Sequence, residues 1–127
     1  MALLRLIILS GSLLVATSTL AASPVQIRFD SACDFSKLSL ILKDPLNPDS
    51  VQLNVELQPQ AAQRLAATTS SNNIGKTLVT VINGIPVNSA TLRTELKVTA
   101  LSIMTDGPTA QKLFPSLLNK ICVSSRK

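Results

Sequence analysis

The chain has 127 residues, 46% of them hydrophobic, with 12 Lys and Arg against 7 Asp and Glu. This length predicts a single domain. With no His, Trp or Tyr and only three Phe, the composition excludes Ser-His and Cys-His catalytic pairs and mixed Cys/His metal sites, and it supplies few rings for stacking on single-stranded nucleic acid. A binding or accessory module is therefore favoured over an enzyme.

Residues 1–22 have the pattern of a secretory signal peptide. Arg5 supplies a positive charge, Leu6 to Ala16 form an apolar core, and Ala21 and Ala22 close the segment with small residues. We expect this segment to be removed, which places the mature chain in the periplasm without a transmembrane segment. The alternative is an N-terminal membrane anchor, but the apolar run is shorter than the roughly 20 residues of a spanning helix.

Residues 23–50 are interpreted as an N-terminal extension that packs on the main domain. Val25, Ile27 and Phe29 alternate with polar residues, as in a short strand. A second apolar run, residues 38–42, is a possible strand, and a proline-containing turn segment follows it.

The next segment predicts a strand followed by a helix. Residues 51–57 alternate apolar and polar side chains, which indicates a half-buried strand. Pro59 then suits the first position of a helix, where its missing N–H costs nothing. Gly75 is predicted to end this helix in a left-handed conformation, followed by a solvated Lys76.

A hairpin and a closing helix complete the pattern. Residues 78–82 read as a buried strand, and Asn83-Gly84 predicts a tight hairpin turn because that turn needs positive φ. A further strand is expected over residues 96–104, and the apolar spacing after Pro108 predicts a helix with a start or kink at Pro115. The order over residues 51–127 predicts an α+β domain, with two helices on one face of a mainly antiparallel sheet.

Two cysteines, Cys33 and Cys122, lie near opposite ends of the mature chain. An even number of cysteines in an exported protein favours a disulfide between them. The alternative is a pair of buried free thiols. A catalytic redox pair is disfavoured because such cysteines are normally close together in sequence.

The run from Leu53 to Ala66, LNVELQPQAAQRLA, and the run from Asn73 to Ala90, NIGKTLVTVINGIPVNSA, resemble the head subdomain of the first periplasmic domain of SecD. Residues 107–113 are similar to the opening of that family's last helix, so the resemblance covers about residues 51–121. Gln58 and Thr91 depart from the family pattern, which has a capping side chain and a proline at these positions.

The resemblance implies a role in protein handling. SecD, with SecF, is a membrane subunit of the bacterial export machinery that uses the proton gradient to draw preproteins into the periplasm. Its head subdomain holds the emerging chain and has no active site. This chain resembles the head alone, as a free-standing exported domain.

The candidate partner-binding surface is the edge of the hairpin, formed by Ile82, Ile85, Val87 and Leu92. An open edge there would accept a strand from an extended peptide. The alternative is that residues 25–29 or 38–42 cover the edge, as natural sheets usually arrange.

Charged residues give no catalytic or nucleic-acid site. Glu56 and Glu95 are expected to be solvent-exposed, and the Lys and Arg residues are scattered rather than clustered. We therefore expect a non-catalytic periplasmic module without a cofactor, which binds protein or unfolded polypeptide of the bacterial envelope or export machinery. The alternative is a structural subunit of an envelope-associated complex.

Overall fold

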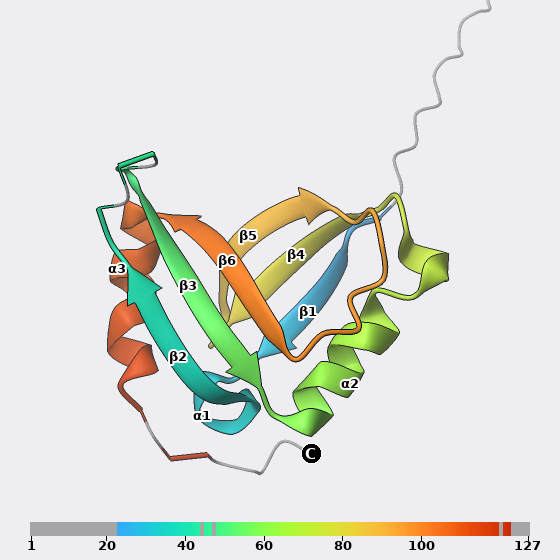
Figure 1. Cartoon of the computed structure of the whole chain (residues 1–127), viewed down its shortest axis with the longest axis horizontal. Helices are drawn as coiled ribbons and strands as arrows, with labels where there is room; N and C mark the ends of the chain where they lie inside the picture. The colour runs from blue at the N-terminus through green and yellow to red at the C-terminus, as the bar shows by residue number, and fades with distance from the viewer. Residues whose placement is uncertain (1–22, 44, 47, 120, 123–127) are drawn as a thin grey trace, which may run out of the picture.

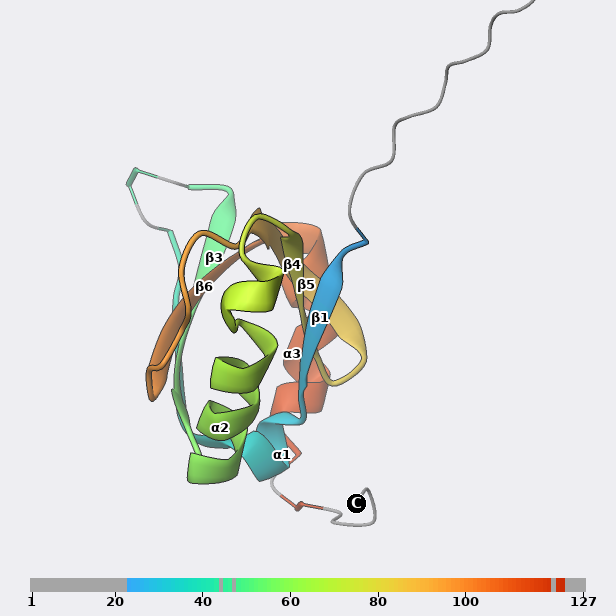
Figure 2. The same cartoon turned by 90° about the vertical axis from the view of Figure 1, so that its right-hand side faces the viewer.

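The computed structural model describes residues 23–43, 45–46, 48–119 and 121–122; the predicted signal peptide, residues 1–22, lies outside them. Six strands form two three-stranded sheets, which face each other as two layers (Figures 1 and 2). In chain order the elements are β1 (Val25–Phe29), α1 (Ser31–Asp34), β2 (Phe35–Ile41), β3 (Ser50–Leu57), α2 (Pro59–Thr68), β4 (Thr77–Ile82), β5 (Ile85–Thr91), β6 (Ala100–Asp106) and α3 (Gly107–Leu117).

The first sheet has the order β2-β3-β6 and is antiparallel throughout. The second has the order β1-β4-β5, in which β4 pairs antiparallel with β5 and parallel with β1. The alternation predicted for residues 51–57 is observed in β3, which buries every second side chain. Both sheets and both long helices contribute to one hydrophobic core, whose largest fully buried aliphatic side chains are Leu53, Val55, Leu65, Ile82 and Leu113.

The α+β class and the mainly antiparallel pairing are confirmed, but the strands form two sheets where one was expected. Residues 25–41 are the reason, since β1 joins β4 and β2 joins β3. The segment predicted as an extension thus supplies one strand to each sheet. In Figure 2, α2 lies between the two layers on the side facing the viewer, and in Figure 1 α3 lies on the opposite side of the molecule. Each helix packs against both sheets.

The helix ends follow local chemistry. Pro59 occupies the first turn of α2, and Gln58 makes no side-chain cap there. The Asp106 carboxyl caps α3 by accepting the Thr109 N–H at 2.8 Å. Hydrogen bonds from the Thr109 side chain and backbone lower the pKa of Asp106. Of the helix start or kink predicted at Pro115, the start was wrong, because α3 begins at Gly107 and contains Pro115.

The strand predicted over residues 96–104 is shifted, because β6 begins only at Ala100. Tertiary hydrogen bonds hold the preceding segment as a loop. The Leu96 N–H donates to the Thr69 hydroxyl at 2.8 Å, and the Thr99 carbonyl accepts the Leu57 N–H at 2.8 Å. In the described part of the chain, no helix is long and apolar enough to cross a membrane.

Two buried threonines provide a matched stability test. The Thr69 hydroxyl donates to the Leu65 carbonyl at 2.8 Å and accepts the Leu96 N–H, whereas the buried Thr105 hydroxyl has no partner among the described residues. Thr69→Val should lower the free energy of unfolding by about 1 to 3 kcal/mol, because it leaves the half-buried Leu96 N–H without its partner. Thr105→Val should leave it unchanged or raise it by up to about 1 kcal/mol. Urea denaturation would measure both, and equal losses would contradict the assignment.

Candidate functional site

The hairpin turn predicted at Asn83-Gly84 joins β4 and β5, with φ of 53° at Asn83 and 83° at Gly84. The Asn83 amide does more than form the turn. Its oxygen accepts the Ser31 N–H at 2.8 Å, and its nitrogen donates to the hydroxyls of Ser31 at 3.0 Å and Ser116 at 2.9 Å. The turn is thereby attached to α1 and α3, a structural role that the dipeptide motif alone does not reveal.

Gly75 has the positive φ expected for it, 93°, but its position differs from the prediction. The helix α2 is capped by Thr69, and Gly75 follows a separate 3-10 turn at Ser71–Asn73, just before β4. Its N–H donates to the Leu92 carbonyl at 2.8 Å. The Lys76 ammonium donates to the Asn73 side chain at 3.1 Å, so both residues stabilise this connection.

The predicted partner-binding edge lies in the core. Ile82, Val87 and Leu92 are buried, and Ile85 is half-buried. The apolar side chains around the hairpin therefore face the opposite sheet and are not available to a partner. β1, residues 25–29, pairs with the outer side of β4, which agrees with the alternative that this segment covers the hairpin.

The exposed strand edge in the described structure is that of β2. Leu38 and Leu40 stand opposite buried residues of β3, which places them on the core side of the sheet, yet both remain partly exposed. Ile41 and Leu42 continue the apolar run and are exposed. No backbone hydrogen bond of residues 36–42 reaches a described residue other than those of β3. Among the described residues, the main-chain groups on the outer side of β2 therefore have no backbone partner beyond β3.

The other edge strands contact further elements. The Arg64 guanidinium of α2 donates to the Arg28 carbonyl of β1 at 2.9 Å. β5 and β6, the remaining edges, pack against each other, and the Asn88 amide of β5 donates to the Met104 carbonyl of β6 at 2.9 Å. These contacts cover part of each of the other three strand edges. The sequence did not identify β2 as an exposed edge, because residues 38–42 were interpreted as a possible strand and as a possible cover of the hairpin.

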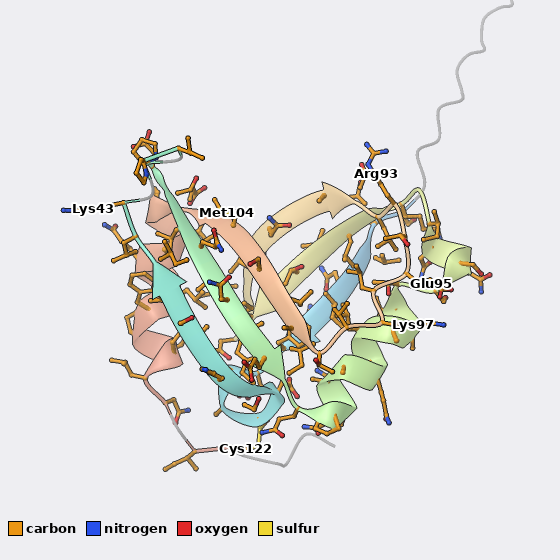
Figure 3. All side chains as sticks on the ribbon, viewed as in Figure 1. Lys43, Arg93, Glu95, Lys97, Met104 and Cys122 are labelled. Carbon is orange, nitrogen blue, oxygen red and sulfur yellow. A yellow bond between two sulfur atoms is a disulfide. The ribbon has the colours of Figure 1, made fainter. Side chains whose placement is uncertain are left out.

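The acidic residues are dispersed over the structure. Glu56 is exposed and stands opposite Lys37 on the outer face of its sheet, where both line a shallow hollow with Asn54 and Ser102. Glu95 lies in the loop before β6, 3.4 Å from the Lys97 ammonium (Figure 3). Within the described residues, no three Cys, Asp or Glu side chains gather as metal ligands.

Cys33 and Cys122 form the predicted disulfide. Cys33 belongs to α1, directly before β2, and Cys122 follows the end of α3 (Figure 3). The bond ties the segment after the last helix to the beginning of the β2 edge. Disulfides persist mainly in oxidising compartments, so the bond suggests an exported location.

Comparison with known proteins gives one structural likeness. No protein-family model and no curated protein matches the sequence. The fold is similar to a solved structure described as "Structure and function of a membrane component SecDF that enhances protein export", with a TM-score of 0.47 and 16% sequence identity. The match covers 68% of this chain, which spans only 36% of the other. This partial likeness of fold involves the same family as the resemblance of residues 51–121.

The hairpin turn gives a stability prediction based on backbone conformation alone. A Cβ at Gly84 would meet nothing within 4 Å, so strain at its positive φ is the main cost of a side chain. Gly84→Val should lower the free energy of unfolding by about 1 to 3 kcal/mol. Gly107→Ala is the control, since its φ is not positive and its new Cβ would lie 3.9 Å from the nearest atom. A Gly84→Val variant with the denaturation midpoint of the wild type would contradict the turn assignment.

The disulfide predicts that native protein, purified from the periplasm, has no thiol that reacts before reduction. Mass measurement with an alkylating reagent, before and after reduction, would check this. The double variant Cys33→Ser/Cys122→Ser should lose up to about 4 to 5 kcal/mol, because the bond closes a long loop, with a sequence separation of 89. Two thiols alkylated in unreduced protein would refute the bond.

Proposed function

We propose that this chain is an exported, non-catalytic module of the bacterial envelope that binds an extended segment of another polypeptide. The observation that carries the proposal is the uncovered edge of β2, next to the exposed apolar run of Leu40, Ile41 and Leu42. A strand edge binds through main-chain hydrogen bonds, and side-chain contacts at alternate positions add selectivity. Such a site requires no nucleophile, base or metal.

An added strand would also complete the core at this edge. Leu38 and Leu40 face the same side as the buried residues of β3 but remain partly exposed. Apolar side chains of a bound strand would cover them on that side of the sheet. The free energy gained per Å² buried is about 25 cal/mol, and the ordering of a flexible segment opposes it.

Two separate observations support an exported location. The Cys33–Cys122 disulfide suits an oxidising environment, and the pattern of residues 1–22 is typical of a cleaved signal peptide. Polypeptides in transit through the envelope are extended and have unpaired backbone groups. We therefore infer that the partners are unfolded or partly folded proteins of the periplasm, including those handled by export machinery.

The test is a titration of isotopically labelled protein with a peptide of about eight residues that alternates valine and threonine. Amide shifts should be centred on residues 36–42 and the paired part of β3, with a dissociation constant above about 1 μM, because one short edge offers limited contact area. Leu40→Asp should weaken binding at least about tenfold, since the apolar contact of Leu40 with the bound strand is lost and a carboxylate must be desolvated.

Ile74→Asp is the matched control, because Ile74 is 39% exposed against 38% for Leu40 and lies outside the sheets. Shifts centred on residues 82–92 would contradict binding at β2. The amide shifts of residues 36–42 should also be measured without peptide. If they then depend on protein concentration, a second copy occupies this edge, and the structural-subunit alternative is favoured.

A further inference from the structure

Among the described residues, the charged side chains of β2 and of the two residues that follow it are both basic. Lys37 is the only charged residue of the strand itself, and Lys43 follows its end with a φ of 59°. Figure 3 shows the Lys43 side chain projecting away from the molecule. Neither lysine forms an ion pair with a described residue. Asp44, the residue after Lys43, lies outside the described residues, so the charge beside a bound strand is assigned to Lys37.

The side of the sheet that Lys37 occupies follows from the register. Lys37 pairs with the exposed Glu56, whereas the next residue, Leu38, pairs with the buried Val55. Lys37 therefore lies on the outer, solvent-facing side, and a strand added to β2 would place one side chain directly beside it. Opposite charges in directly opposed positions stabilise a strand pair, and like charges destabilise it.

This charge pattern disfavours a second copy of the chain as the occupant. An antiparallel pair of β2 strands centred on Leu40 would cover the apolar run best. That register brings Lys37 of each copy near Lys43 of the other, just beyond the end of its strand, and like charges would meet at both ends of the interface. A segment that carries a carboxylate is the better complement.

Resting on the proposed function, we propose that the bound segment carries an acidic side chain opposite Lys37 and apolar side chains at the positions opposite Leu38 and Leu40. The carboxylate would extend the row of alternating charge that begins with Glu56 and Lys37. The neighbouring residue, opposite Leu38, and the residue two positions further along, opposite Leu40, point to the other side of the sheet and cover these two leucines. The partner class is therefore an extended apolar segment with an acidic residue.

The test uses the whole mature chain and two peptides of alternating valine and threonine. One peptide carries glutamate and the other lysine at a central threonine position. At low salt, wild-type protein should bind the glutamate peptide about two- to fivefold more tightly, and added salt should reduce that preference. Lys37→Gln should abolish the preference, and Lys37→Glu should reverse it in favour of the lysine peptide.

Arg93→Glu is the control with the same change in net charge, because Arg93 is exposed and lies in the loop after β5, far from Lys43 in Figure 3. It should leave the preference of the wild type intact. Equal binding of both peptides to wild type and Lys37→Glu would overturn the acidic preference while leaving strand addition in place. If Arg93→Glu changed the peptide preference as much as Lys37→Glu, the preference would be a general effect of net charge, and the proposed contact with Lys37 would be refuted. Failure of both peptides to bind any variant would refute the proposed function itself.

Discussion

The packing of this protein depends on one partly buried ion pair, between the buried Asp34 and the partly exposed Arg64. The Asp34 side chain is 4% exposed and accepts two guanidinium hydrogen bonds, at 3.0 and 3.3 Å, as well as the Asp30 N–H at 2.7 Å. Removing a carboxylate from water is costly unless such partners replace it, and loss of one partner of a buried pair typically costs about 3 to 5 kcal/mol. Arg64 is 44% exposed, so water would offset part of that cost. The same guanidinium also binds the Arg28 carbonyl and lies over the Phe29 ring, which joins α2 to the end of β1.

The ion pair matters because the chain crosses from one sheet to the other at this point. The Asp34 carbonyl accepts the Gln58 N–H at 2.7 Å, immediately before α2, and β2 starts at the next residue, Phe35. Ser31, at the other end of α1, holds the Asn83 turn, and Cys33 within it forms the disulfide. A helix of four residues thus connects β1, α2, the hairpin and the segment after α3. The direction and position of the β2 edge follow from how firmly α1 is held.

Local patterns predicted most elements of this fold and little of their assembly. Alternation identified β3, the Asn83-Gly84 dipeptide identified the hairpin, and Pro59 marked the start of α2, because each signal depends on residues that are close in sequence. The pairing of β1 with β4 joins residues about 50 positions apart, and no local period encodes it. The shifted start of β6 has the same cause, since the Thr69 hydroxyl holds the Leu96 N–H in a loop across 27 positions. The division into two sheets therefore became apparent only from the three-dimensional structure.

The candidate site shows this limit most clearly. Val87 on β5 and Leu40 on β2 are both aliphatic residues of short strands, and composition cannot distinguish them. Val87 is buried because β5 lies against β6 and α3, whereas Leu40 is partly exposed because the chain places nothing described beyond β2. Exposure of an apolar residue in a sheet is decided by the order of the strands, which is a property of the whole fold. A search for the binding edge of such a domain should therefore begin with strand order and hydrogen-bond partners, and only then consider hydrophobicity.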